Sequence, residues 1–297
     1  MESPPRISVG VALSTCDRPA YLRHLLATLQ NDPTSPEIAI YVADNGHASM
    51  QEIAAEFGVQ YRRIDAPGIS VSRNAALDMA VSGGHAYIAF IDDDEWPAPG
   101  WLAALLETAT RQKAQLVGGP ALPDPNATIP QWLHEGDYLA KGPDNYGTYN
   151  LLIETAALPP RGEWFSDHCN LVGGEDDEMI RRIRAKGARF VYCEAALVYE
   201  HVPPSRLHPS RYVRNGLRQG ATAVAAMRFR GVSPLRMWQR ILARASRKTA
   251  FGLYHLLLIP TGYWHLVQAR KDFATARSLI LSGLGKRYVF YSRDADH

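Results

Sequence analysis

The sequence is poor in cysteine and lacks a long uninterrupted hydrophobic run. Its 297 residues include three cysteines, Cys16, Cys169 and Cys193, whose odd number and wide spacing give neither a disulfide framework nor a Cys-x-x-Cys metal pair. The apolar stretch 251–267 contains glycine, histidine and proline and is shorter than the ~20 residues of a spanning helix. The N-terminus does not have the pattern of a signal peptide. We therefore expect a cytoplasmic protein of a reducing compartment.

Acidic residues are absent from positions 201–271, where 13 lysine and arginine residues occur. Residues 1–200 instead carry 27 Asp and Glu against 15 Lys and Arg, so the small net charge of +2 hides a division of the chain. This asymmetry predicts that the later segment contacts something anionic, either a phosphorylated ligand or a lipid surface. The hydrophobic content of 46% excludes wholesale disorder.

Short apolar runs alternate with segments of helical periodicity over the first 200 residues. Strands are predicted at 7–13, 37–42, 60–64, 86–91, 114–118 and 190–199. Helices are predicted at 21–29, 51–57, 70–81 (with Ser72 as a possible cap), 101–111 and 175–186. The alternation indicates an α/β fold with a doubly wound, mainly parallel sheet. Residues 120–160 are expected to be irregular and residues 211–284 helical.

Polar loops follow three of the predicted strands, at 14–18, 44–46 and 92–95. Ligands of such sheets bind beyond the carboxyl ends of the strands, so we expect the three loops on one edge. Asp92, Asp93 and Asp94 repel one another unless a cation neutralises them. Their hard oxygen donors favour Mg²⁺ or Mn²⁺ bound together with substrate phosphates. A solvated acidic turn is the alternative, and the position at a strand end favours the metal.

A second acidic cluster, GGEDDE at 173–178, begins a predicted helix. Carboxylates at a helix N-terminus are stabilised by the macrodipole and by capping, so a purely structural role is one interpretation. The other is a general base raised on a glycine-rich elbow above the substrate. The spacing alone does not separate the two.

The segment PGISVSRN at 67–74 also begins a helix. Gly68 permits a tight backbone turn, and Arg73 in the following helix has the reach to contact a diphosphate. A surface ion pair is an equally good interpretation of this arginine.

Six segments, in this order along the chain, resemble the motifs of family 2 glycosyltransferases. They are ALSTCDRP, VADNG, PGISVSRNAAL, FIDDDEWPAPGWL, GGEDDEMIRRIRAKG and CEAALVYEHVPPSR. The resemblance covers about residues 5–220 and is closest to the succinoglycan-type subgroup of bacterial exopolysaccharide enzymes. Asp17 departs from the pattern because asparagine is more usual there, and Ala75 and Ala76 stand where a glycine is common.

The resemblance implies a GT-A catalytic domain at residues 1–220 that transfers a sugar from a nucleotide sugar, with UDP as the expected nucleotide. Asp94 would hold the metal, with Asp92 or Asp93 assisting, and His201 is either a third ligand or an ordinary loop residue. Asp176 would be the base that deprotonates the acceptor hydroxyl, so that the anomeric configuration inverts. The acceptor would be a lipid-linked or cell-surface polysaccharide precursor.

Contacts to the donor are implied for several further positions. Asp44 would contact the uracil-type base. Arg214 and Arg218, four residues apart on one helix face, either clamp phosphates or form a solvated basic face. The remaining positions assigned to the nucleotide sugar are Thr15, Arg18, Gly68, Arg73, Asn74, Asp92 and Asp93.

The tail at 221–297 has the pattern of a basic amphipathic helix. Arg236, Arg240, Arg244 and Lys248 repeat every four residues, and the apolar face is formed by Trp238, Ile241, Leu242 and Ala245. Such helices lie in membrane interfaces, so we expect peripheral association with the inner face of the cell membrane. The alternative is a helical cap that docks on the catalytic domain.

Two other functions fit parts of the sequence. A nucleotidyltransferase shares the α/β sheet and the metal carboxylates, but such enzymes carry a Gly-rich loop with a basic residue directly after the first strand, where Ser14 to Arg18 stand here. A nucleic-acid-binding protein would use the basic tail. The tail lacks a stacking platform, so no nucleic acid is expected as a partner.

Overall fold

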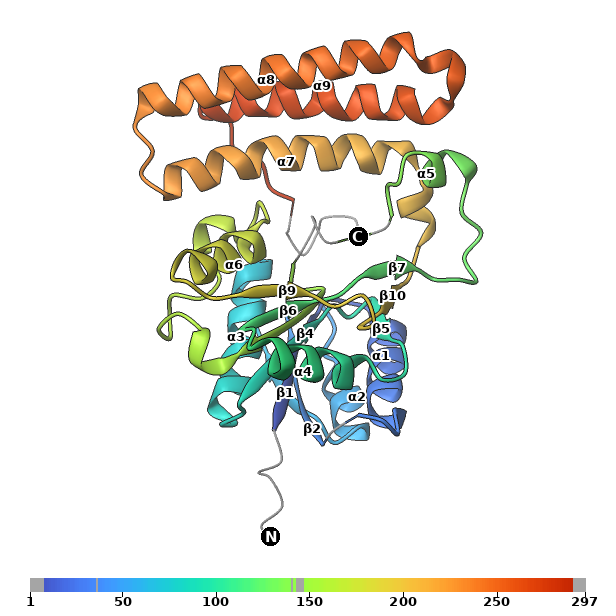
Figure 1. Ribbon diagram of the computed structural model, residues 1–297, viewed down its shortest axis with the longest axis vertical. Helices are drawn as coiled ribbons and strands as arrows, with labels where there is room; N and C mark the ends of the chain where they lie inside the picture. Colours follow the sequence, from blue (N-terminus) through green and yellow to red (C-terminus); the bar gives the residue numbers. More distant parts are fainter. Residues whose placement is uncertain (1–7, 36, 140, 143–146, 291–297) are drawn as a thin grey trace. The chain divides into compact units, whose positions relative to one another are not determined.

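The computed structural model describes residues 8–35, 37–139, 141–142 and 147–290 (Figure 1). The chain divides into two compact units. The first unit comprises Met1–Pro125, Ala140–Ser166 and Glu175–His201. The second unit comprises Asn126–Leu139, Asp167–Gly174 and Val202–His297.

A seven-stranded sheet forms the centre of the first unit, in the order β3-β2-β1-β4-β8-β6-β9. Its strands are β1 (Val9–Thr15), β2 (Ile38–Asp44), β3 (Gln60–Arg63), β4 (Tyr87–Ile91), β6 (Leu116–Gly118), β8 (Asn150–Glu154) and β9 (Phe190–Tyr192). The strands β3, β2, β1 and β4 are parallel, whereas β8 runs antiparallel to both β4 and β6. The predicted α/β fold with a mainly parallel sheet is confirmed.

The alternation of side chains along β1 shows why helices cover both faces of this sheet. Val9, Val11 and Leu13 enter one hydrophobic core and Ala12 enters the other, as the period of two in a strand requires. The first core is closed by α1 (Pro19–Asn31), α2 (Gln51–Glu56) and α4 (Trp101–Gln112). The second is closed by α3 (Ile69–Ser82) and α6 (Glu175–Ala185) (Figure 1). The sheet is therefore doubly wound.

A small second sheet is made of β5 (Glu95–Pro97), β10 (Val198–Glu200) and β7 (Ala121–Pro123). The prediction of one strand over residues 190–199 was wrong, because β9 belongs to the large sheet and β10 to the small one. A turn closed by the bond from Ala196 N to Cys193 O separates them. The nearly continuous apolar sequence hid that turn.

Two further predictions were wrong. Residues 120–160 are not irregular throughout: β8 lies among them, with its apolar Leu151, Leu152 and Ile153 buried between β4 and β6, and a one-turn helix η1 (Thr155–Ala157) follows. Ser72 does not cap α3, since it lies inside the helix and Gly68 is the residue before the first turn.

The second unit is helical, with α5 (Gln131–Glu135), α7 (Pro209–Phe229), α8 (Pro234–Leu257) and α9 (Tyr263–Gly283). Three single turns complete it: η2 (Asp167–Cys169), η3 (Pro204–Leu207) and η4 (Ile259–Thr261). Gly216 and Gly220 let α7 approach α9 closely, because a Cβ at either position would collide with α9 atoms. The prediction of helix over residues 211–284 is confirmed.

The apolar face predicted for the tail helix is largely packed within this unit. Ile241 is fully buried, Ala245 is 4% exposed, and Trp238 packs against the same cluster, which also contains residues of α7 and α9. Leu242 alone of the four predicted residues is exposed. No helix within the described residues is both long and apolar enough to cross a membrane.

Candidate active site

The acidic triplet follows β4 directly, where the parallel strands end. Asp93 accepts hydrogen bonds from the hydroxyl of Thr15 and from the guanidinium of Arg18, both at 2.8 Å, and Arg18 also lies 3.2 Å from Asp94. Asp93 and Asp94 are both buried. Burial raises the pKa of Asp93 to about 6, although Arg18 opposes the shift. The structure thus brings together four residues that the sequence assigned to metal and donor binding.

Arg73 on α3 joins the loop after β4 to the start of α6. Its guanidinium lies 3.0 Å from Asp92 and forms a second ion pair with Glu175, the first residue of α6. Both Arg73 and Glu175 are buried. The contact of Arg73 with a diphosphate stays a prediction.

A partly exposed lysine, Lys141, pairs with two buried carboxylates next to the acidic triplet. Lys141 Nζ lies 3.1 Å from Glu95 and 2.9 Å from Glu200, and 4.4 Å from the ring centre of Tyr149. The other oxygen of Glu95 accepts the backbone N–H of Asp92 at 3.1 Å. Burial raises the pKa of Glu95 well above its usual value, and Lys141 opposes that shift. The group therefore fixes the backbone at the first residue of the triplet.

The backbone of His201 is hydrogen-bonded to the acidic triplet. Its N–H donates to the carbonyl of Asp94 at 2.8 Å, and its imidazole stacks on Tyr21 with ring centroids 4.3 Å apart. Among the described residues, no three or more His, Cys, Asp and Glu side chains are grouped so that they hold a metal ion by themselves. Metal ligation by His201 stays a prediction.

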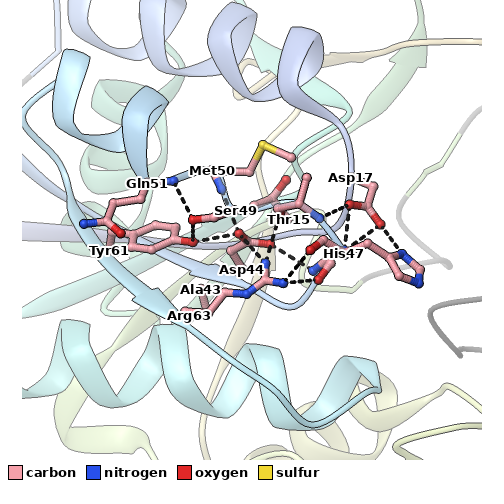
Figure 2. Close-up of polar contacts among 12 residues, drawn as sticks. Thr15, Asp17, Ala43, Asp44, His47, Ser49, Met50, Gln51, Tyr61 and Arg63 are labelled. Atoms are coloured by element: carbon pink, nitrogen blue, oxygen red, sulfur yellow. Dashed lines mark hydrogen bonds and ion pairs between the residues drawn. The ribbon is translucent and has the colours of Figure 1, made fainter.

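Asp44, the residue expected to contact the base, is fully buried at the end of β2 (Figure 2). Its carboxylate accepts the backbone N–H groups of Gly46 and Met50, each at 2.9 Å. Tyr61 and Arg63, from β3, donate to it at 2.7 and 2.8 Å. The carboxylate of Asp44 thus fixes the backbone of the loop that follows β2.

Asp17 joins the loop after β1 to the loop after β2 (Figure 2). It has a φ of 53° and accepts the backbone N–H groups of His47 and Ala48 at 2.7 and 3.0 Å, while His47 Nδ1 lies 2.8 Å away. Burial alone would raise the pKa of Asp17, but these hydrogen bonds outweigh it and lower the pKa to about 2. A Cβ at Gly46 would collide with Asp17, so the two loops meet at a glycine.

Gly68 and Asn74 connect α3 and the residue before it to two neighbouring loops. Gly68 has a φ of 115°, a conformation that favours glycine, and its carbonyl accepts the amide of Asn45 at 3.1 Å. The side chain of Asn74 bonds both the N–H and the carbonyl of Phe165, at 3.0 and 2.8 Å. Direct contact of either residue with the donor stays a prediction.

Asp176, the predicted base, lies in the first turn of α6. Gly173 and Gly174 precede that helix, both with a φ of 87°, so the glycine-rich elbow is present in the backbone. Gly147 lies against the Asp176 carboxylate, and a Cβ there would collide with it. Asp177 points to another partner, Arg181, at 2.7 Å.

A small pocket lies at the carboxyl ends of β1 and β4. Ser14, Arg73, Asp92 and Thr148 contribute its polar lining. Thr148 is 1% exposed, and its hydroxyl has no hydrogen-bond partner in the part of the chain that the structure describes. Buried hydroxyls nearly always have a hydrogen-bond partner. A ligand or a water molecule in the pocket would supply the partner that the hydroxyl of Thr148 lacks.

Arg214 and Arg218 lie on α7, in the second unit, and both side chains are partly exposed. Their role as a phosphate clamp stays a prediction.

Several residues of this site were missed from the sequence. Tyr61 and Arg63 belong to a predicted strand, and the position of Arg63 at its carboxyl end was a usable signal. Glu95 and Glu200 lie within two of the recognised motifs, but the sequence assigned neither of them a role. Lys141 lies in the segment expected to be irregular, and no local pattern marks it.

The carboxylates after β4 suit a divalent cation of the predicted kind. Mg²⁺ and Mn²⁺ take hard oxygen donors and are bound through one or two carboxylates, with water and substrate phosphates completing the shell. Asp92 keeps a third of its side chain exposed, and Asp94 follows two residues later on the same loop. The exposed oxygens of Asp92 suit such a cation, whereas Asp94 is buried beside Arg18, and ligation by the two residues stays a prediction.

The comparisons with known proteins agree with this geometry. Residues 11–161 match the family model described as glycosyl transferase family 2. The chain is 30% identical over 233 residues to the succinoglycan biosynthesis protein ExoM of Rhizobium meliloti (strain 1021), covering 73% of this chain and 74% of that protein. The chain belongs to glycosyl transferase family 2. It is a glycosyltransferase, as the six motifs predicted.

Solved structures of lower identity show the same fold. The mannosyltransferase PcManGT from Pyrobaculum calidifontis, in complex with GDP-Man and Mn²⁺, has a TM-score of 0.59 at 16% identity and covers 94% of this chain and 88% of its own. TarS of S. aureus, residues 1–349 with UDP-GlcNAc, has a TM-score of 0.53 at 14% identity and covers 97% and 100%. The GT-A fold expected for this glycosyl transferase family 2 member is confirmed.

Proposed function

We propose that this glycosyltransferase moves a sugar, with inversion, from a nucleotide sugar to a hydroxyl of a lipid-linked or cell-surface polysaccharide precursor. The observation that carries the proposal is the link made by Arg73, which ties Asp92 to the start of the helix that holds Asp176. This link supports the proposal because it connects a carboxylate proposed for the metal and donor with the helix that carries the proposed base. The resemblance to ExoM, named for succinoglycan biosynthesis, supports the polysaccharide acceptor.

The reaction is a single displacement. Asp176 takes the proton of the acceptor hydroxyl, whose oxygen forms the new bond to the anomeric carbon as the bond to the diphosphate breaks. Asp94 and Asp92 would hold Mg²⁺ or Mn²⁺, which would offset the charge of the departing nucleoside diphosphate. UDP is the nucleotide we propose, because TarS has been solved with UDP-GlcNAc; PcManGT, solved with GDP-Man, makes GDP the alternative.

Donor contacts are proposed for the residues of the sheet edge. The loop that the buried Asp44 holds in place would contact the base, with Asp44 itself reached only if the donor displaces one of its present partners. Thr15 and Arg18 would position the triplet that faces the phosphates. We place the enzyme at the inner face of the cell membrane, where a lipid-linked acceptor is accessible.

Nucleotide-sugar turnover and UDP or GDP binding test the proposal, measured with and without Mn²⁺ in the wild-type chain and in Asp94→Ala. We expect metal-dependent binding that Asp94→Ala loses. Glu107→Ala removes an exposed carboxylate of α4 and serves as the control. A folded wild-type chain that binds neither UDP nor GDP, with or without Mn²⁺, contradicts the proposal.

A further inference from the structure

The last turns of α8 and the turn into α9 expose a group of large apolar side chains. We name this group the apolar tip: Phe251, Leu253, Tyr254, Leu257, Ile259 and Tyr263. Leu257 is 79% exposed, and Phe251, Leu253 and Tyr254 are each more than half exposed. Helices α8 and α9 run antiparallel as a hairpin, and the tip lies at its turn (Figure 1). Contiguous apolar exposure of this kind marks an interaction surface.

The packing of α8 leaves the tip facing outward. Met237, Ile241, Ala245 and Gly252 are the buried positions of this helix, and their spacing defines its inward stripe. This stripe supplies the residues of α8 that pack in the hydrophobic core of the second unit. The apolar side chains of the tip contribute little to that core.

A row of arginines precedes the tip on the exposed surface of α8. We name it the basic row: Arg236, Arg240, Arg244 and Arg247. Steps of three and four residues place these guanidiniums on one face of the helix. The first acidic residue after position 200 is Asp272, which is 1% exposed and is bonded by Lys248 at 2.6 Å. The basic row therefore has no nearby exposed carboxylate in its own helix or in the following turn.

We infer that the α8–α9 hairpin docks on an anionic lipid bilayer, with the apolar tip inserted among the acyl chains and the basic row on the headgroups. The inference rests on the membrane location proposed above and names the residues that would produce it. An amphipathic element with arginines on one face and the exposed leucines Leu253 and Leu257 on another is the form that lies in a membrane interface. Tyrosines at the edge of such a surface suit the boundary between apolar and wet environments.

Charge argues against a second copy of this chain as the occupant. Two hairpins packed along α8 would bring two basic rows together, and residues 201–271 supply no carboxylate to pair with them. Glu135 is the exposed acid beside the turn, next to Gly262, and it is a single carboxylate against four arginines. Anionic headgroups would provide the opposite charge where the arginines of the basic row lie. Each arginine near such a surface raises the binding constant for the membrane about fivefold. The bilayer therefore matches both the apolar and the charged parts of the surface.

Flotation of the full chain with vesicles tests the inference, using phosphatidylcholine with and without phosphatidylglycerol. We expect binding to the anionic vesicles that weakens with salt. Leu253→Glu/Leu257→Glu should lower binding by about tenfold or more, because two apolar side chains are lost from the inserted surface. Arg240→Gln/Arg244→Gln should lower it by about fivefold per charge. Leu284→Glu, at an exposed leucine beyond the end of α9, is the matched control and should bind as the wild type does.

Circular dichroism and nucleotide binding without vesicles should be unchanged in every variant, which shows that the variants fold and separates this test from that of the transfer reaction. Four results would overturn the inference: no vesicle binding by the wild type, equal binding by Leu253→Glu/Leu257→Glu, self-association through the tip without vesicle binding, or binding to RNA in place of vesicles. Loss of nucleotide binding in a folded chain that still binds vesicles would refute the proposed reaction alone.

Discussion

Arg73 on α3 forms an ion pair of 3.0 Å with Asp92, the first residue after β4. The same guanidinium also pairs with the buried Glu175 at the start of α6. One buried cation therefore holds two carboxylates from segments more than 80 positions apart, and its removal leaves uncompensated charge in the interior.

We expect Arg73→Met to lower the free energy of unfolding by about 3 kcal/mol, the usual cost of breaking a buried pair by removing one partner. Urea denaturation measures the change. Arg62→Met, which breaks the exposed pair with Asp78, is the control and should cost about 1 kcal/mol or less. Equal effects of the two substitutions would show that burial of the Arg73 pair has no energetic consequence.

Asp176 and Asp177 are neighbours in the first turn of α6 with different surroundings. Asp177 pairs with Arg181 on an exposed face, whereas the Asp176 carboxylate lies against Gly147. We expect Asp176→Asn to lower kcat roughly a hundred- to ten-thousand-fold with little change in KM for the donor, since only the proton acceptor is lost. Asp177→Asn should keep activity near that of the wild type. Comparable kcat values for the two variants would rule out Asp176 as the base.

Asp17 gives the stability of the first unit a defined pH dependence. Its pKa in the folded chain is about 2, below the ordinary value of 3.8, so its contribution is complete above about pH 4 and is lost as the pH falls toward 2. Asp17→Asn should be less stable than the wild type by about 1–2 kcal/mol at neutral pH, after allowance for solvent screening. Thermal unfolding across this pH range should show the difference shrink in acid. Asp65→Asn, in the exposed loop after β3, should show no such trend.

Lys141 neutralises the buried Glu95 and Glu200, so its loss should destabilise the chain. Lys141→Met should lower the free energy of unfolding by about 3 kcal/mol, and Lys141→Met/Glu95→Gln should recover part of that loss because one unpaired carboxylate is gone. Lys186→Met, at an exposed lysine after α6, is the control. Denaturation that gives the double variant the same stability as the single one would argue against the charge explanation.

The hydroxyl of Thr148 provides a prediction that separates binding from stability. Thr148→Val removes a buried hydroxyl that has no partner among the described residues, so the melting temperature should stay the same or rise. If the hydroxyl bonds the donor, KM for the nucleotide sugar should rise by up to about tenfold, and Thr148→Ser should restore it. An unchanged KM in Thr148→Val would show that the hydroxyl does not contact the donor.

Local sequence was sufficient for much of the first unit. The short apolar runs ending in polar residues predicted β1, β2 and β4, and a parallel sheet necessarily places those ends on one edge. The acidic triplet followed from the same argument. Motif order then identified the family before any contact was known.

Contacts between distant segments required the tertiary structure. Pairing of β8 between β4 and β6 depends on hydrogen bonds across the chain, and three apolar residues within a long polar segment do not reveal it. Lys141 acquires its role only because folding brings Glu95 and Glu200 to it. The sequence of α8 showed an amphipathic helix, but which apolar residues it buries depends on the helices packed against it, and these cover Ile241 while leaving Leu257 exposed. Sequence periodicity determines the faces of an element, and long-range packing decides which of those faces remain available for function.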